Sequence, residues 1–182
     1  MASTPYGLRD VKITPITTTA GVGAYGTMID LPNAQTFSFS ESEDYSELRG
    51  DDKVAAKRGN GPTVEWTLEN GGISLEAYAA INGGTLTVSG TGATTKKTYK
   101  KKATDARPYF YVEGQAISES GGDFHAIVYK CIADGSLEGE LKDSEFWISK
   151  ADGTGIGNTA GDLYDFVENA TKTDIVVPTG TP

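Results

Sequence analysis

The sequence predicts a mainly β protein, and three observations support that prediction. Apolar and polar residues alternate with a period of two in several segments, as they do along half-buried strands. The 23 glycines are scattered through the 182 residues without a strict period, which indicates many turns. Only one short segment, at about residues 74–82, has helical spacing. We therefore expect strands with one short flanking α-helix, a long hairpin arm and extended termini.

The first half of the chain contains the clearest strand patterns. Val11 and Ile13 share one side of an extended segment, and so do Phe37 and Phe39. A third such segment places Val64, Trp66 and Leu68 on one side. The opposite sides of the last two segments are polar and consist of Thr36, Ser38 and Ser40, and of Thr63, Glu65, Thr67 and Glu69. We expect these polar faces to meet water.

Residues 41–61 lie between the last two strands and contain many charged and few apolar side chains. They begin Glu41-Ser42-Glu43-Asp44-Tyr45 and end Lys57-Arg58-Gly59-Asn60-Gly61. Such a composition cannot anchor the segment in a core. We therefore expect a long hairpin arm that projects from the sheet and contacts another molecule.

The second half begins with the single expected helix. Ser74 can cap its first turn, and Asn82-Gly83-Gly84 can end it. Strand patterns follow at residues 85–89, 99–102, 107–117, 124–133 and 144–149, and Gly121-Gly122 marks a turn between the two longest. Small residues dominate after Lys150. We expect a β domain over residues 1–150 and a C-terminal extension over residues 151–182 that docks without folding alone.

The charge balance argues against a nucleic-acid-binding protein. With 16 basic and 25 acidic residues the net charge is −9, so the average field repels a polyanion. Five lysines between positions 96 and 102 are the exception, and a solvated hairpin rim explains such a run. The N-terminus lacks a basic region followed by an apolar run, so we expect synthesis in the cytoplasm.

Two motifs resemble ligand sites, but the surrounding sequence favours other interpretations. Gly155-Ile156-Gly157 fits part of a dinucleotide-binding fingerprint, yet no alternating βα pattern surrounds it. Residues 134–145 loosely fit a calcium-binding loop that begins at Asp134 and closes at Glu145. Strand-like segments rather than helices flank this loop. We expect a hairpin connection there, and calcium binding remains an open alternative.

The residues needed for common catalytic sites are scarce. His125 is the only histidine and Cys131 the only cysteine. On an extended strand they would lie on the same side and roughly 20 Å apart, too far for a nucleophile and its base. No second histidine is present to complete a zinc site. We expect both residues to be packing positions, and we expect no enzymatic activity, cofactor or metal.

Taken in order, these features resemble the major tail protein, or tail-tube protein, of siphophages. The resemblance covers most of the chain. The segments on which it rests are Leu31-Pro32-Asn33-Ala34, Leu48-Arg49-Gly50-Asp51-Asp52-Lys53-Val54-Ala55, Val64-Glu65-Trp66-Thr67-Leu68, Arg107-Pro108-Tyr109-Phe110-Tyr111-Val112-Glu113-Gly114, Phe124-His125-Ala126-Ile127-Val128-Tyr129-Lys130-Cys131 and Glu145-Phe146-Trp147-Ile148-Ser149.

The resemblance implies a β-sandwich or split barrel with one flanking helix. Six copies would close into a ring, and rings would stack into a hollow tube through which DNA passes without specific binding. Strand pairs from neighbouring subunits would form a continuous β-barrel around the lumen. The implied partners are further copies of the chain, a tape-measure protein and tail-end proteins. The implied location is the virion tail after synthesis in the bacterial host cytoplasm, with no membrane.

The resemblance also assigns expected roles to surface residues. An acidic lumen wall would repel the passing duplex, and the candidates for that wall are Ser38, Ser40, Glu65 and Glu69. The arm would contact the next ring, through candidates Glu41, Glu43, Asp44, Tyr45, Arg49, Asp51, Asp52 and Lys53.

Two other classes of protein remain open. One is a related assembly protein, such as a head decoration protein, a tail-completion protein, or the tube of a contractile or secretion-type needle. The other is a secreted carbohydrate-binding sandwich, which would need an exposed aromatic row. Trp66 shares its side with core residues, so Tyr109 and Tyr111 are the main candidates for such a row.

Overall fold

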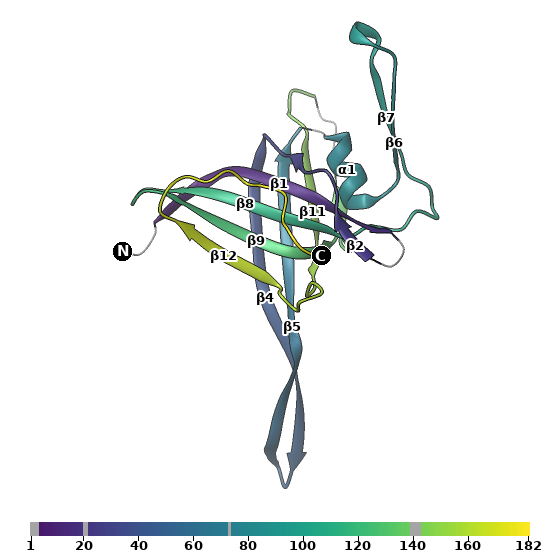
Figure 1. The fold of residues 1–182 in the computed structure, drawn as a ribbon. Helices are drawn as coiled ribbons and strands as arrows, with labels where there is room; N and C mark the ends of the chain where they lie inside the picture. The colour runs from purple at the N-terminus through teal and green to yellow at the C-terminus, as the bar shows by residue number, and fades with distance from the viewer. Residues whose placement is uncertain (1–3, 20–21, 73, 139–142) are drawn as a thin grey trace.

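The structure is a computed structural model that describes residues 4–19, 22–72, 74–138 and 143–182. It is mainly β, as the sequence predicts. Among the described residues, ten strands form one antiparallel sheet that folds over into two layers, and two further strands form a small separate hairpin (Figure 1).

The first layer is built around three long strands, β1 (Pro5–Thr19), β8 (Phe110–Ser118) and β9 (Asp123–Ile132). The short strands β2 (Val22–Tyr25) and β3 (Ile29–Asp30) pair with β1, and β12 (Tyr164–Asn169) pairs with β9. The expected turn between β8 and β9 is confirmed, since Gly121 and Gly122 both have positive φ. A positive φ suits glycine because it has no Cβ.

The second layer consists of β4 (Ala34–Gly50), β5 (Lys53–Gly71), β11 (Ile148–Gly155) and the short β10 (Leu137–Glu138). Its strands cross those of the first layer at a steep angle (Figure 1). The layers are continuous at one corner, where Thr154 and Gly155 of β11 pair with Ile132 and Cys131 of β9. This arrangement is a sandwich with crossed layers.

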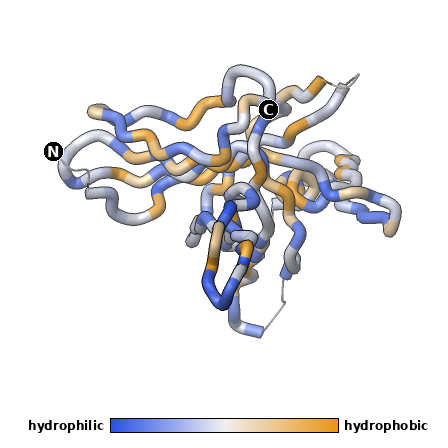
Figure 2. Tube along the Cα trace, turned by 90° about the horizontal axis from the view of Figure 1, so that it is seen from below, coloured by the Kyte–Doolittle hydropathy of each residue, from blue (hydrophilic) through white to orange (hydrophobic). Residues whose placement is uncertain are grey.

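The core lies between the layers, and the expected alternation places residues there. Val11, Ile13, Val64, Trp66 and Leu68 are all buried. Hydrophobic and hydrophilic residues accordingly alternate along many of the strands in Figure 2. Trp66 meets the edge of Phe110 across the two layers, with 5.3 Å between ring centroids. Burying each large apolar side chain stabilises the fold by about 1.5–3 kcal/mol.

The predicted helix is confirmed as α1 (Leu75–Asn82). Ser74 caps it, because its Oγ accepts a hydrogen bond from the N–H of Ala77 at 3.2 Å. At the other end Gly83, with φ 71°, donates its N–H to the carbonyl of Ala79. Ala80 and Ile81 are buried, so the helix closes one end of the core. No helix among the described residues is long and apolar enough to cross a membrane.

A second hairpin projects from the α1 end of the molecule (Figure 1). It consists of β6 (Thr85–Ser89) and β7 (Lys96–Lys100), with a short 3-10 helix, η1 (Gly92–Thr94), at its tip. The strand expected at residues 85–89 is confirmed. Its partner begins at Lys96 rather than at residue 99, because the hairpin register pairs Ser89 with Lys96.

The expected division at residue 150 falls inside β11, so residues on both sides of it belong to one sheet. Ala151 pairs with Leu68, and Gly155 pairs with Val64. The strand expected at residues 144–149 therefore lies later, at Ile148–Gly155. Its small residues resemble a tail in sequence, but packing requires them. A Cβ at Gly153 would lie 2.8 Å from the Trp66 ring.

Residues 170–182 form no helix or strand and run back across the outer side of the first layer (Figure 1). Ile175 is buried in this segment, and the hydroxyl of Thr159 donates a hydrogen bond to the carbonyl of Pro182 at 2.6 Å. This last part of the chain docks on the domain without pairing with a strand.

Candidate assembly surfaces

The side of β4, β5 and β11 that points away from the core is polar, and we call it the polar face. The register places Ser38 beside Thr67 and Ser40 beside Glu65, while Phe37 and Phe39 on the opposite side meet Leu68 and Trp66. Ser38, Ser40 and Glu65 are exposed, and Glu69 is half-buried. All four candidate lumen residues therefore lie on one solvent-facing surface.

Strand β11 extends the polar face with Lys150 and with two residues that the sequence analysis assigned to the C-terminal extension. Lys150, Asp152 and Thr154 pair with Glu69, Thr67 and Glu65. The hydroxyl of Thr154 donates a hydrogen bond to Asp134, which lines the same hollow as Glu65, Thr67 and Asp152. The one basic member, Lys150, lies 3.6 Å from Glu69. With four carboxylates and one lysine, the face is net negative.

The strands that bound the polar face have edges without a partner. Among the described residues, β4 pairs only with β5, and β10 pairs only with β11. Unpaired edges expose rows of backbone N–H and C=O groups that can pair with another chain. β4 runs from Ala34 to Gly50, so its free edge is long.

The arm predicted at residues 41–61 is a two-stranded ribbon with two register shifts, and it projects far from the sheet (Figure 1). β4 and β5 continue into it, and pairing extends from Tyr45↔Gly59 to Gly50↔Lys53. The turn residues Asp51 and Asp52 have φ of 46° and 62°. Two-residue hairpin turns require positive φ, and aspartate tolerates it better than most residues.

The candidate arm residues divide into two groups by their contacts. Glu43 accepts hydrogen bonds from the Tyr45 hydroxyl at 2.8 Å and from the N–H of Gly61 at 3.3 Å, so it holds the ribbon together. The hydrogen bond to Glu43 raises the pKa of Tyr45. Lys57 lies over the Tyr45 ring, 4.5 Å from its centroid.

Two of the remaining candidates have one side-chain contact each. Glu41 accepts a hydrogen bond from the hydroxyl of Tyr164, and Arg49 pairs with Glu47 at 3.2 Å. Within the described part of the chain, the other four arm candidates make no ion pair or side-chain hydrogen bond; these are Asp44, Asp51, Asp52 and Lys53.

Two exposed apolar residues near the tip of the arm were not among the contact candidates predicted from the sequence. Leu48 is 66% exposed and Val54 is 49% exposed. The charged neighbours obscured them, because they form no periodic apolar pattern. Apolar side chains on a projecting ribbon are suitable contact points for another molecule.

A buried ionisable cluster lies on the outer side of the first layer, under the C-terminal segment. His125 Nδ1 is 2.5 Å from Glu113 Oε1, and His125 Nε2 is 3.1 Å from Asp123 Oδ2. Asp123 also accepts hydrogen bonds from the backbone N–H of Thr173 at 2.7 Å and from Asn169 at 2.9 Å. The cluster therefore joins the C-terminal segment to the sheet.

The surroundings of the cluster favour its charged forms. Burial raises the pKa of Asp123, but hydrogen bonds from Thr173, Asn169, His125 and Gln115 outweigh it and bring the pKa down to about 2. Burial lowers the pKa of His125, but Glu113 and Asp123 outweigh it and raise that pKa overall. His125 thus lies between Glu113 and Asp123, and both contacts favour its protonated form.

His125 and Cys131 lie on opposite sides of β9, and the expectation that they share a side is wrong. Between the pairs Phe110↔Cys131 and Val112↔Val128, β8 advances by two residues and β9 by three. This β-bulge adds one residue to β9 and reverses the alternation beyond it. Cys131 consequently packs in the core, and burial raises its pKa.

The structure also bears on the dinucleotide-binding motif and the calcium-loop motif. Gly155 ends β11, and no helix follows it among the described residues, which a dinucleotide fingerprint would need. Residues 139–142 of the calcium-loop motif lie outside the described residues. Within the described part of the chain, no group of three or more His, Cys, Asp or Glu side chains is arranged to hold a metal ion.

The aromatic row considered for a carbohydrate-binding protein does not form. Tyr111 is only 3% exposed, because it packs between Tyr25 and Tyr129 and donates a hydrogen bond to Glu113. Trp66 is buried as well. Tyr109 is 37% exposed and has Lys130 over its ring, so it offers one partly covered platform.

No protein-family model matches this sequence, and a search of curated proteins also finds no match.

Proposed function

We propose that this chain is the subunit of a phage tail tube, in which six copies form a ring and rings stack into a hollow conduit for DNA. The observation that supports this best is the polar face. It covers one side of the β10-β11-β5-β4 layer, is net negative, and is bounded by strands with unpaired edges.

Edge pairing between copies accounts for both unpaired strands. If β4 of one copy pairs with β10 of the next, the four-stranded layers join into a closed barrel with no free edge. The core side of each layer faces its own domain, so the polar face must line the inside of the barrel. The unpaired edges thereby become the ring interface.

The sign of the charge on the polar face suits a conduit for DNA. A duplex binds basic surfaces because lysine and arginine release its condensed counterions. The polar face has the opposite charge, because it has one lysine, Lys150, and four carboxylates: Glu65, Glu69, Asp134 and Asp152. A lumen of this kind repels the duplex and lets it slide.

The proposal assigns the arm to contacts between stacked rings and places the chain in the virion tail, with a tape-measure protein and tail-end proteins as further partners. A ribbon that touches little of its own domain is available to a neighbouring ring. Its exposed Leu48 and Val54 provide apolar contact points, and its charged residues provide polar ones.

Electron microscopy of the purified chain, with mass measurement in solution, tests the proposal. We expect hexameric rings and open-ended hollow tubes whose abundance rises with protein concentration. A strictly monomeric protein at all concentrations would contradict it.

Another virion or needle assembly protein is the second candidate, because free strand edges and a projecting arm suit any of them. The same experiment separates the two. A head decoration protein would form a small closed oligomer, whereas heterologous contacts between tube rings leave the stack open.

A further inference from the structure

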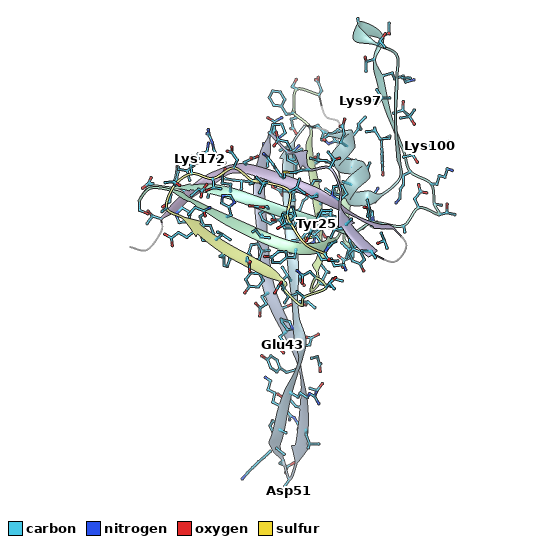
Figure 3. All side chains as sticks on the ribbon, in the orientation of Figure 1. Tyr25, Glu43, Asp51, Lys97, Lys100 and Lys172 are labelled. Atoms are coloured by element: carbon cyan, nitrogen blue, oxygen red, sulfur yellow. The ribbon has the colours of Figure 1, made fainter. Side chains whose placement is uncertain are left out.

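The β6–β7 hairpin concentrates positive charge in an otherwise acidic protein. Residues 85–102 include Lys96, Lys97, Lys100, Lys101 and Lys102, which are five of the 16 basic residues of the chain, and no Asp or Glu. Figure 3 shows Lys97 and Lys100 on this projection, far from Glu43 and Asp51 on the arm. We call residues 85–102 the basic hairpin.

The basic hairpin is firmly held at its base although it projects. The hydroxyl of Tyr99 donates to the carbonyl of Gly83 at 2.7 Å and accepts from Asn82 at 3.0 Å, and its ring packs against Tyr78 of α1. Lys97 forms an ion pair with Glu76 at 2.5 Å. These contacts fix the direction in which the hairpin points.

Apart from these contacts, several groups of the basic hairpin have no partner in the described part of the chain. β6 and β7 pair only with each other among the described residues, and Val88 is exposed. Lys96, next to the tip, and Lys100, at the base, make no ion pair within that part of the chain, and both are exposed. An isolated two-stranded ribbon is marginally stable, so contact with another molecule would stabilise it.

A complementary acidic surface lies at the opposite end of the molecule, around the base of the arm. Glu41, Glu43 and Asp44 begin the arm, and the Tyr164 hydroxyl of β12 donates to Glu41 at 2.7 Å. We call these three carboxylates the acidic collar. Within the described chain none of them pairs with a lysine or arginine.

We propose that the basic hairpin of one copy docks on the acidic collar of the copy above it in the stack; this inference rests on the proposed function. The two surfaces project from opposite ends, so copies that are related by translation along the tube bring unlike charges together. Inverted copies would bring like charges together instead. Charge complementarity of this kind selects partner orientation and speeds association.

In this proposal the hairpin contact forms alongside the one made by the arm. Each strand of the basic hairpin has five residues, or about 17 Å at the rise of an extended chain. As the arm of the upper copy reaches down beside the lower copy, the basic hairpin of the lower copy reaches up to the collar. Every pair of stacked copies would thus make two reciprocal contacts.

A charge-swap experiment tests the docking. The hairpin variant is Lys96→Glu with Lys100→Glu, and the collar variant is Glu41→Lys with Asp44→Lys. The matched control is Arg9→Glu with Lys172→Glu, which changes the net charge by as much as the hairpin variant at two exposed positions outside the hairpin (Lys172 is labelled in Figure 3). Thermal melting and ring mass verify that each variant folds and forms rings.

We expect the hairpin and collar variants each to raise the protein concentration needed for tube formation at least tenfold near physiological salt. The control should stack like the wild type. The protein with both charge pairs swapped should recover stacking, since unlike charges meet again. High salt should weaken wild-type stacking.

The outcomes separate this inference from the proposed function. If the wild type forms tubes and the hairpin and collar variants both stack normally, the docking is wrong and the proposed tube function still stands. Absence of rings and tubes in the wild type would overturn the proposed function and the docking with it. If the wild type binds a labelled DNA duplex, and the hairpin variant loses that binding while stacking normally, the hairpin is a nucleic-acid site instead.

Discussion

The carboxylate of Asp123 accepts a hydrogen bond from the backbone N–H of Thr173 at 2.7 Å, which fastens the C-terminal segment to the first layer. Asp123 is completely buried, and Gln115 supports the same contact by donating to Asp123 and to the carbonyl of Thr173, each at 2.6 Å. Residues 170–182 have no strand pairing to hold them. Their docking therefore depends on this one buried side chain and a few further contacts.

Asp123→Asn should loosen the C-terminal segment. The asparagine loses the charge and turns an NH2 group toward existing donors, so we expect the free energy of unfolding to fall by about 2–3 kcal/mol. Hydrogen exchange at residues 170–182 should rise as well. Asp165→Asn is the control, because Asp165 is an exposed acid that accepts one hydrogen bond from Tyr129, and it should change stability by less than about 1 kcal/mol. Equal losses in the two variants would contradict the role of Asp123.

We expect the stabilising contribution of His125 to be lost as the pH rises. Its pKa is raised in the fold, so its contribution is complete below the unfolded pKa of about 6.5 and is lost as pH rises through the folded pKa. The contribution of Asp123 follows the opposite rule, since its lowered pKa means that stability is lost only as pH falls toward about 2. Denaturant unfolding of wild type and His125→Gln at pH 5 and pH 9 tests this. The difference between the two proteins should be larger at pH 5, and an equal difference at both would contradict it.

We expect Glu65 and Glu69 to contribute little to the stability of the fold and to act on DNA in the proposed lumen. Changing both to glutamine should lower the free energy of unfolding by no more than about 1 kcal/mol, because Glu65 is exposed and the Glu69–Lys150 pair is partly exposed. Changing both to lysine should leave tubes intact but make them retain duplex DNA at low salt. DNA ejection from particles with the lysine variant measures this effect.

Glu168→Lys is the control for the lysine variant, because Glu168 is exposed on β12 and lies outside the polar face. It should not affect DNA passage. Normal ejection through tubes with lysine at both positions 65 and 69 would show that the polar face does not line the lumen. If the variant with glutamine at both positions 65 and 69 unfolds, the carboxylates of Glu65 and Glu69 belong to a network that folding requires.

The arm should be dispensable for the fold and required for stacking. A variant in which a two-residue turn replaces residues 44–61 keeps the Glu43↔Pro62 pair and should melt at nearly the wild-type temperature, because the arm pairs only with itself. We expect it to form rings that do not stack. In the intact chain, hydrogen exchange at residues 44–60 should slow markedly on assembly. Strong, equal protection in free subunit and tube would contradict an assembly role.

Gly153→Ala should destabilise the fold although it adds only a methyl group. A Cβ at position 153 would lie 2.0 Å from the carbonyl oxygen of Ile132, which is backbone and cannot rotate away. We expect a loss of 2 kcal/mol or more, of the order seen for overpacked cores. Gly50→Ala is the matched control, because nothing lies within 4 Å of its added Cβ. Denaturant unfolding measures both variants.

Local patterns were sufficient to predict much of this protein. The alternation at Val64, Trp66 and Leu68 identified a half-buried strand and its polar face, because strand side chains point alternately to the two sides whatever the strand packs against. Ser74 and Gly83 marked the ends of the helix, since capping depends on neighbouring backbone groups. The charged segment of residues 41–61 indicated an arm, because it contains too few apolar residues to enter a core.

Only the tertiary structure decided the features that depend on contacts between distant segments. Gly153 and Gly155 resemble a tail in sequence, and the need for small residues appears only when Trp66 and Val128 lie against them. One extra residue in β9 places His125 and Cys131 on opposite sides of the strand. This β-bulge leaves no pattern in the local sequence from which it could be predicted. The buried cluster of Glu113, Asp123 and His125 likewise requires β8 and β9 to pair in this register, because only the register brings its charges within hydrogen-bonding distance.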